Sequence, residues 1–239
     1  MSSLSGREII LAGGTGGLGQ ASAESLAAEG ASLVLSYRSN EQRAREYARL
    51  GKLLRADLSE PDDRSALLDA APQMYGLVVF SGEAVRVKDP AEVEAAIKRS
   101  TATNFIGPIM LAREAAERMK GSSVEGSLVI VSTMQATALF EGSTAYAAPK
   151  AALVHAGQVL AKECRGKANI RVNVVCPGAN YAGMAESSIA SGKYDRYLNA
   201  DMIPRWGRAD DVAKLVRYLL EPDNYITGQV ITIDGGLTL

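Results

Sequence analysis

Tyr146 and Lys150 are the two residues of this sequence whose types and spacing point most directly to chemistry. Residues four apart project from one face of a helix, so the phenol and the ammonium can meet. A free tyrosine has a pKa of about 10, which is too high for proton donation and return at neutral pH. A nearby ammonium stabilises the phenolate and lowers that pKa, as a general acid and base requires. The pair predicts a proton-transfer site, but such pairs also arise by chance on helix surfaces.

The position of the pair strengthens this interpretation. The predicted strand Leu128–Val131 ends at Ser132-Thr133, and Thr133 stands thirteen residues before Tyr146.

A glycine-rich stretch, Gly13-Gly14-Thr15-Gly16-Gly17-Leu18-Gly19, lies between the first predicted strand and a helix. Glycines permit positive φ and remove the Cβ atoms that would keep the backbone away from a diphosphate. The helix N-terminus adds free N–H groups and a positive dipole end. Gly14, Gly16 and Gly19 fit the Gly-x-Gly-x-x-Gly spacing in the strand–turn–helix context that confirms it. A tight turn without a ligand is the alternative.

The residues after the second predicted strand bear on the choice of dinucleotide. An Asp or Glu there would bind the ribose hydroxyls of NAD, but this chain has Ser36-Tyr37-Arg38-Ser39. Arg38 can hold the 2′-phosphate of NADP, with Ser36, Ser39 and Asn40 adding hydrogen bonds, so NADP (NADPH) is favoured over NAD. Arg38 as a solvated surface charge is the alternative. Asp57 follows the third strand, where it would bind the adenine amino group or cap the next helix.

These residues need a scaffold, and the chain alternates short apolar runs with longer helical patterns. The runs predict strands at Glu8–Ala12, Ser32–Ser36, Leu53–Ala56, Leu77–Phe80, Leu128–Val131, Val172–Val175 and Val230–Ile233. The longer patterns predict helices at Gln20–Glu29, Asn40–Arg49, Asp62–Ala70, Ala91–Arg99, Phe105–Lys120, Ala147–Arg165 and Asp210–Leu220. This alternation predicts an α/β fold, a doubly wound seven-stranded parallel sheet with helices on both faces, forming one domain over residues 1–239.

Residues 177–208 interrupt the alternation, because they contain no predicted strand and their apolar residues are scattered. A long excursion in a compact domain is usually a lid or a binding loop. It follows the sixth strand, so it would lie over the carboxyl edge of the sheet, where open α/β folds bind ligands. Gly183 and Gly192 suggest mobility. We expect a substrate lid rather than a flap that only covers the core.

Composition excludes several classes of protein. The formal net charge of −1 predicts no attraction to nucleic acid or to an anionic membrane. The two cysteines, Cys164 and Cys176, have no metal or redox spacing and are expected to be buried thiols. No apolar run is long enough to span a membrane, and Met1 to Arg7 does not look like a secretory signal. We therefore expect a cytoplasmic protein without a metal.

Five motifs resemble those of the short-chain dehydrogenase/reductase family, over nearly the whole chain. Gly13-x-x-x-Gly17-x-Gly19 is similar to its cofactor motif, and Tyr146-x-x-x-Lys150 to its hallmark pair. The others are Asn104 in Thr103-Asn104-Phe105-Ile106-Gly107, the Pro177-Gly178 that follows Val172–Cys176, and Ile233-Asp234-Gly235-Gly236. The resemblance, closest to 3-oxoacyl-[acyl-carrier-protein] reductase-like members, implies a Rossmann fold.

The resemblance also implies roles for individual residues. Tyr146 would donate a proton to a carbonyl oxygen while nicotinamide delivers hydride, and Lys150 would lower the tyrosine pKa and bind the nicotinamide ribose. Thr133, or Ser132 if the loop register shifts, would polarise the carbonyl, and Asn104 would kink its helix and seat a water. The expected cofactor-binding residues are Gly13, Thr15, Gly16, Gly17, Leu18, Gly19, Arg38, Ser39, Asp57, Leu58, Ser81, Gly82, Tyr146, Lys150, Pro177 and Gly178.

Three departures from the family pattern are visible. Thr133 stands where the family usually has Ser, and it is stiffer and bulkier. Val79-Phe80-Ser81-Gly82 replaces Asn-Asn-Ala-Gly, so part of the hydrogen bonding near the cofactor must differ. Pro149 removes one N–H from the catalytic helix, at small cost if that helix begins near Ser143 or Thr144.

The favoured function is an NADPH-dependent oxidoreductase that interconverts a ketone and a secondary alcohol. A 3-oxoacyl or other apolar ketone is the leading substrate class, because the lid is apolar. The alternative is a catalytically silent NADP(H)-binding sensor or scaffold; a methyltransferase lacks the expected acid after the second strand. His155, the single histidine, is interpreted as a packing or contact residue. The family forms subunit interfaces with the helices Phe105–Met119 and Ala147–Cys164, so a homotetramer or dimer is expected.

Overall fold

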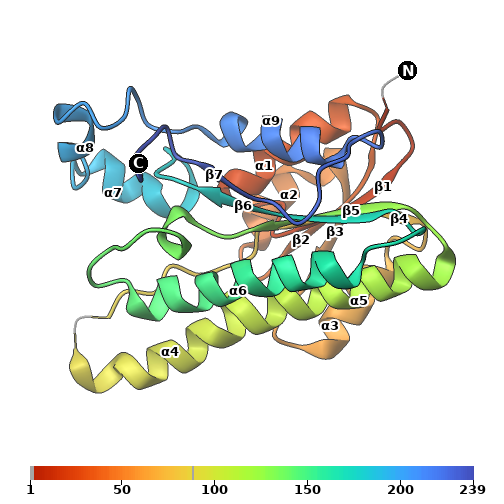
Figure 1. Cartoon of the computed structure of the whole chain (residues 1–239), viewed down its shortest axis with the longest axis horizontal. Helices are drawn as coiled ribbons and strands as arrows, with labels where there is room; N and C mark the ends of the chain where they lie inside the picture. Colours follow the sequence, from red (N-terminus) through yellow and green to blue (C-terminus); the bar gives the residue numbers. More distant parts are fainter. Residues whose placement is uncertain (1–2, 88) are drawn as a thin grey trace.

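A parallel sheet forms the centre of the molecule, and the computed structural model describes residues 3–87 and 89–239. Its seven strands lie in the order β3-β2-β1-β4-β5-β6-β7 (Figure 1). They are β1 (Glu8–Ala12), β2 (Ser32–Tyr37), β3 (Gly51–Arg55), β4 (Met74–Val79), β5 (Gly126–Val131), β6 (Ile170–Pro177) and β7 (Val230–Ile233). The expected doubly wound fold class is confirmed.

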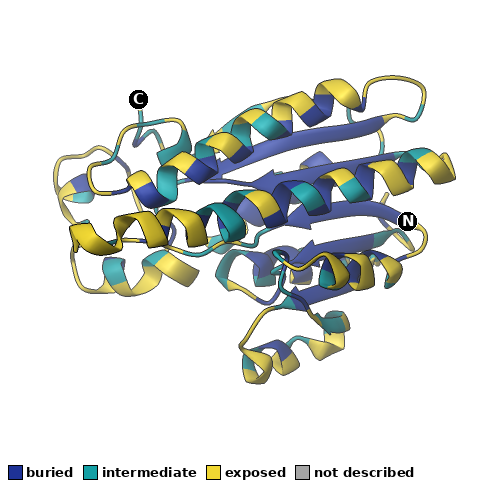
Figure 2. Ribbon diagram, turned by 90° about the horizontal axis from the view of Figure 1, so that it is seen from below, coloured by how far each residue is buried: buried dark blue, intermediate teal, exposed yellow. Residues whose placement is uncertain are grey.

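Helices cover both faces of this sheet because its strands are apolar on both sides. In β1, Ile9 and Leu11 belong to the core cluster under α1 and α9, whereas Ile10 and Ala12 belong to the cluster under α5 and α6. Seen from below, the helices of the second face bury one side on the strands and expose the other (Figure 2). The main helices are α1 (Gly17–Ala28), α2 (Glu41–Glu46), α3 (Pro61–Asp69), α4 (Val93–Thr101), α5 (Gly107–Ser122), α6 (Thr144–Glu163) and α9 (Ala209–Leu220).

The strand order reverses between β1 and β4, which lie side by side at the centre of the sheet. At such a switch point the loops that leave neighbouring strands diverge to opposite faces and open a crevice. The loop after β1 is the glycine-rich stretch, and the loop after β4 begins at Phe80, whose N–H donates to the carbonyl of Ala12 at 2.8 Å. The topology therefore places the glycine loop and Ser81-Gly82 side by side.

The expected gap between the fourth and fifth helices is wrong. Helices α4 and α5 are joined by a π-helical turn, Ala102–Ile106, so that they continue as one rod (Figure 1). The wider turn places the Asn104 side chain, which is fully buried, against the loop after β4. In place of the expected kink at Asn104, the structure has a π turn within a continuous helix, a feature common at functional positions.

The segment 177–208 contains two short helices, α7 (Glu186–Ala190) and α8 (Arg196–Asn199), and a single bridge between Asn180 and Gly207. It lies at the carboxyl end of the strands (Figure 1). Several of its apolar side chains pack on one another, on the loop after β5 and on the chain end, and four members of the resulting cluster, Met134, Phe140, Tyr194 and Tyr197, also line the cavity at this edge of the sheet. This lid cluster consists of Met134, Phe140, Tyr194, Tyr197, Leu198, Ile203, Trp206 and Leu237.

The cysteines and the histidine lie outside the set of residues expected to act in the site, although Cys176 is next to Ser132, Thr133 and Lys150. Cys164 and Cys176 are free and buried, as expected, and His155 lies exposed on α6. Within residues 3–87 and 89–239, no helix has both the length and the apolar character that crossing a membrane demands. The same residues contain no cluster of His, Cys, Asp and Glu suited to a metal ion.

Candidate active site

A cavity of about 650 Å³ runs along the carboxyl edge of the sheet, from the end of β2 to the lid. Its volume is in the range of small-molecule and cofactor sites. All of the sequence-predicted site residues line it except Asn104, which lies directly behind it. Those lining residues are Gly13, Thr15, Gly16, Gly17, Leu18, Gly19, Arg38, Ser39, Asp57, Leu58, Ser81, Gly82, Ser132, Thr133, Tyr146, Lys150, Pro177 and Gly178.

The glycine loop has the shape of a phosphate cradle. Helix α1 has Gly16 as its N-cap, with no side-chain hydrogen bond to its first N–H groups, so these remain available to an anion. Gly13 has a φ of +78°, a conformation that favours glycine. Its N–H donates to the Ser36 hydroxyl at 3.0 Å, which fixes the loop against β2. The donors and the missing Cβ atoms fit the diphosphate of a dinucleotide.

Gly19 provides a stability test of this loop. A Cβ at Gly19 would lie 2.6 Å from the carbonyl oxygen of Gly13 and 2.8 Å from the Cα of Gly14. Because both atoms are backbone, we expect Gly19→Ala to lower the melting temperature and weaken NADPH binding. Gly121, in α5, has nothing within 4 Å of its Cβ position. Gly121→Ala should therefore be neutral or stabilise by up to ~1 kcal/mol, as for an ordinary helix position.

Thermal unfolding and NADPH fluorescence of both variants check this prediction. Equal melting temperatures for Gly19→Ala and Gly121→Ala would contradict the tight packing of the loop.

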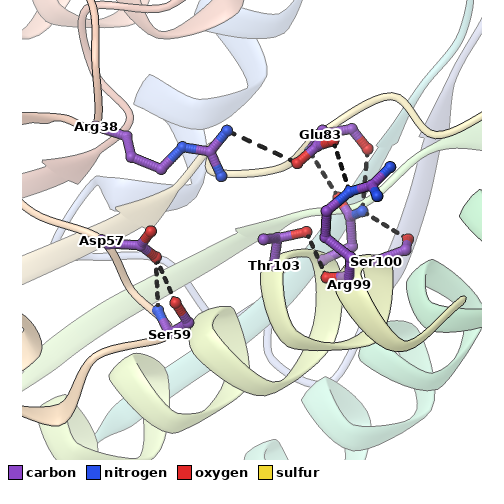
Figure 3. A network of polar contacts seen from close by, with 8 residues as sticks. Arg38, Asp57, Ser59, Glu83, Arg99, Ser100 and Thr103 are labelled. Carbon is purple, nitrogen blue, oxygen red and sulfur yellow. Dashed lines mark hydrogen bonds and ion pairs between the residues drawn. The ribbon is translucent and has the colours of Figure 1, made fainter. Parts of the chain in front are cut away.

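At the end of β2 the site is cationic. Arg38 is half exposed and pairs with Glu83 at 3.7 Å, and Glu83 also pairs with Arg99 at 3.3 Å (Figure 3). Arg43 lines the same part of the cavity. Arg38 thus has a specific partner and is not merely a solvated charge.

Three other residues considered for this end already have partners. The Ser36 hydroxyl is engaged by Gly13, and the Asn40 side chain accepts from the N–H of Arg43 at 3.0 Å as the cap of α2. Asp57 accepts hydrogen bonds from the N–H and hydroxyl of Ser59, at 3.0 and 2.6 Å. Burial acts to raise the pKa of Asp57. The two hydrogen bonds from Ser59 together outweigh this effect, so the pKa is lowered. Asp57 therefore caps a turn and also faces the cavity.

Tyr146, near the start of α6, points into the cavity beside Thr133. Burial raises the pKa of Tyr146, while a hydrogen bond to Thr133 and the positive charge of Arg86 act to lower it. The net direction is upward, opposite to the lowering expected from Lys150, so the phenol holds its proton at neutral pH. The sequence reasoning omitted the desolvation of a tyrosine that lies inside the cavity.

Lys150 does not lower the pKa of Tyr146 as expected, because its ammonium bonds to backbone carbonyls. It donates to the carbonyls of Val131 at 3.1 Å and Ser81 at 3.5 Å. Only 2% of Lys150 is exposed, and burial lowers its pKa to about 8. A lysine tuned to this value by desolvation is a mark of a functional site.

Asn104 joins the site through the loop after β4. Its side-chain oxygen accepts from the N–H of Glu83 at 2.9 Å, and its amide donates to the Glu83 carbonyl at 3.0 Å and to the Ser100 hydroxyl at 2.9 Å (Figure 3). A Cβ at Gly82 would lie 2.8 Å from the Asn104 oxygen and 3.1 Å from the Lys150 ammonium. Gly82 is thus required by the close approach of both side chains.

The remaining departures have structural explanations. The Ser132 hydroxyl donates to the carbonyl of Lys150 at 2.9 Å, so Thr133 is the hydroxyl that faces Tyr146. Helix α6 begins at Thr144, which places Pro149 in its second turn, just past the N–H groups that have no helical partner, so its missing N–H removes one helical hydrogen bond near the helix start.

Four charged residues of this region were missed from the sequence: Arg43, Glu83, Arg86 and Lys193. None belongs to a motif: Arg43 reaches the cavity from α2, Arg86 and Lys193 reach it from loops, and Glu83 is connected to it through its ion pair with Arg38. The charge of the segment after β4 was the one available signal.

Comparisons with known proteins agree with this geometry. Residues 12–238 match the family described as Enoyl-(Acyl carrier protein) reductase. An uncharacterised oxidoreductase of Methylorubrum extorquens is 31% identical, covering 99% of this chain and 100% of its own. The chloroplastic NADPH-dependent aldehyde reductase 2 of Arabidopsis thaliana is 29% identical, covering 99% of this chain and 95% of its own.

A solved short-chain type dehydrogenase/reductase from Mycobacterium ulcerans has the same fold. Its TM-score is 0.90 at 26% identity, covering 100% of this chain and 91% of that one. The order of the motifs, the sheet and these matches agree over nearly the full length. The chain belongs to the short-chain dehydrogenase/reductase family of oxidoreductases.

Proposed function

We propose that this oxidoreductase reduces a carbonyl compound with NADPH, using Tyr146 as the proton donor. One observation carries the proposal: the phenol of Tyr146, beside Thr133, lines the same cavity as the glycine cradle and the buried Lys150. A reductase needs these parts within one site, because proton and hydride must reach adjacent atoms of the substrate.

The glycine loop, Arg38 and Lys150 would hold the dinucleotide, which supplies hydride to the carbonyl carbon when bound. Tyr146 donates its phenolic proton to the carbonyl oxygen, and the product is the secondary alcohol. Because burial raises its pKa, the phenol is protonated at neutral pH and ready to act as the acid. Thr133 lies beside the phenol, and the positive charge of Arg86 favours the phenolate that remains.

Two features support NADPH rather than NADH. The three residues directly after β2, Arg38, Ser39 and Asn40, include no acid, and Arg38 lies at the cavity edge, where a 2′-phosphate would reach it. The Arabidopsis relative is named for its NADPH dependence. Glu83, which pairs with Arg38, would compete with that phosphate.

We expect Arg38→Ala to weaken NADPH binding by about 10–100-fold, the value of one or two charge-assisted hydrogen bonds. NADH binding should change less than about twofold. Glu83→Gln frees Arg38 from an exposed ion pair and should tighten NADPH binding by about 2–5-fold. Fluorescence titration with each nucleotide measures both effects. A parallel loss of NADPH and NADH affinity in Arg38→Ala would contradict the assigned role.

For the substrate, a 3-oxoacyl or other apolar ketone is the starting class, supported by the acyl-carrier-protein description of the matching family. The alternative, a silent NADP(H) sensor, is favoured by the altered Phe80-Ser81 loop. NADPH oxidation measured with a panel of ketones and aldehydes separates the two. Tight NADPH binding without any oxidation would support the sensor.

We also propose a cytoplasmic homo-oligomer. Ile106, on the π turn, and Val159, on α6, are exposed apolar side chains. A second copy of the chain could cover them, because the family forms its subunit interfaces with the helices that correspond to α5 and α6.

A further inference from the structure

Two cationic side chains line the end of the cavity that lies beyond Tyr146. Arg86 comes from the loop between β4 and α4, and Lys193 comes from the lid between α7 and α8. Of the described residues that line the cavity, Asp57 alone is acidic, and it lies at the opposite end beside Arg38. The end that faces the substrate is therefore purely cationic.

The two cations converge on one side chain. The Arg86 guanidinium donates to the hydroxyl of Tyr194 at 3.4 Å, and the Lys193 ammonium lies 5.6 Å from the centre of the same ring. Neither makes an ion pair with a carboxylate in the described part of the chain. By contrast Arg205, at the other end of the lid, pairs with Asp211 at 2.6 Å. Two like charges near one ring repel each other unless an anion lies between them.

These charges lie close to the reacting centre. The positive charge of Arg86 reaches Tyr146 strongly enough to act on the pKa of its phenol. Among the apolar residues of the lid, Ile203 and Trp206 pack in the lid cluster without lining the cavity, whereas Tyr194 and Tyr197 belong to both. Met184 lines the cavity as an exposed apolar side chain. An apolar substrate alone thus leaves the most specific groups of the pocket without a partner.

We propose that the ketone reduced at Tyr146 carries an anionic group, a carboxylate or a phosphate, that binds between Arg86 and Lys193. The inference rests on the proposed carbonyl reduction and narrows its substrate class. The guanidinium offers paired N–H donors to an anion, and the ammonium adds a flexible point charge from the lid. Because Lys193 belongs to the lid, an anion bound to both cations also draws the lid towards the loop after β4.

A matched pair of substrates tests the proposal: acetoacetate and its neutral methyl ester, each with NADPH. We expect wild type to prefer the acid in kcat/KM. This preference should fall by about tenfold in Arg86→Gln and again in Lys193→Gln, the value of one charge-assisted hydrogen bond. Arg86→Lys should keep part of the preference for the acid. The ratio of acid to ester removes any common effect of Arg86 on Tyr146.

Lys167→Gln is the matched control. Lys167 is exposed and does not line the cavity, so its replacement should leave the ratio unchanged. Acetoacetyl-CoA identifies the source of the anion, because its phosphates lie far from the ketone. If Arg86→Gln and Lys193→Gln lower kcat/KM for acetoacetate, the bound group is a carboxylate near the ketone. If they lower kcat/KM only for the CoA thioester, the bound group is a phosphate.

Trp206 supplies a readout that needs no turnover. It is the single tryptophan and packs on the lid cluster, so its fluorescence should respond when a ligand binds beside Tyr194. In the presence of NADP, acetoacetate should bind more tightly than the ester. Loss of this difference in the variant that combines Arg86→Gln with Lys193→Gln supports the proposal. Equal kcat/KM and equal binding for acid and ester, together with unchanged acetoacetyl-CoA reduction in Arg86→Gln and Lys193→Gln, overturn it, while reduction itself still stands. If no ketone oxidises NADPH, the proposed function is wrong, and the titration alone decides on the anion site.

Discussion

Replacing Tyr146 with phenylalanine is expected to lower kcat for ketone reduction by about 10²–10⁴-fold, the usual value of a positioned general acid. The change removes one oxygen from a side chain that is largely enclosed by the cavity, next to Thr133. The ring remains, so packing in the first turns of α6 is preserved. NADPH affinity should stay within about threefold of wild type, because the phosphate cradle and Arg38 are unchanged.

The direction of the reaction adds a pH test. Reduction needs the protonated phenol, whereas oxidation of the alcohol needs the phenolate. Because the pKa of Tyr146 is raised by burial, reduction should stay constant through neutral pH and fall only at alkaline pH. Alcohol oxidation should rise over that alkaline range, and both dependences should vanish in Tyr146→Phe.

Tyr225→Phe is the control for Tyr146→Phe, because Tyr225 is fully exposed and lies outside the cavity. It makes the same chemical change without touching the site, and its kcat should equal that of wild type. A Tyr146→Phe enzyme that keeps more than about a tenth of the wild-type kcat would show that another group donates the proton.

The architecture was predictable because its signals are local and repeated. Strands such as Leu128–Val131 are continuous apolar runs, and they are covered on both faces, as such runs predict. Boundaries were less predictable where polar residues extend a buried strand. Strand β6, for example, starts at Ile170 and includes Arg171 and Asn173, both buried and hydrogen-bonded to backbone carbonyls. Only tertiary partners make such residues acceptable in a strand.

The motif-bearing part of the site was predictable for a similar reason. Spacing along one helix or one loop places Tyr146 near Lys150, and Gly13 near Gly19, whatever the rest of the chain does. The partners of Arg38 and Tyr194 were not predictable, because Glu83 and Arg86 come from a loop without a regular backbone pattern. The direction of the pKa shift of Tyr146 was also not predictable, since it depends on how much water the folded cavity leaves around the phenol.

Lys150→Met is expected to reduce kcat by at least about 100-fold while leaving the folded protein more stable at pH 7. Among the residues that the structure describes, the buried Lys150 ammonium has no carboxylate partner. Its pKa is lowered from an ordinary value above 10 to about 8, which corresponds to a cost of about 3 kcal/mol when it is charged. Loss of the hydrogen bond to the Val131 carbonyl costs about 1 kcal/mol, leaving a gain of about 2 kcal/mol.

The pH dependence isolates this charge. Below pH 8 the lysine is protonated in both the folded and the unfolded chain, so the advantage of Lys150→Met is constant. Between pH 8 and about 10.4 the unfolded chain binds more protons than the folded one, so the stability of wild type rises relative to the variant. The advantage should shrink over this window and reverse near its upper end.

Urea unfolding of both proteins from pH 7 to 10 measures this gap, because other titrating groups are common to the two and cancel. Lys167→Met, at an exposed lysine, should show no gap that depends on pH. A Lys150→Met protein that is less stable than wild type at pH 7, with a gap independent of pH, would mean that the buried ammonium stabilises the fold. The expected outcome instead makes Lys150 a residue that the fold retains at a cost in stability, which binding and proton transfer in the cavity require.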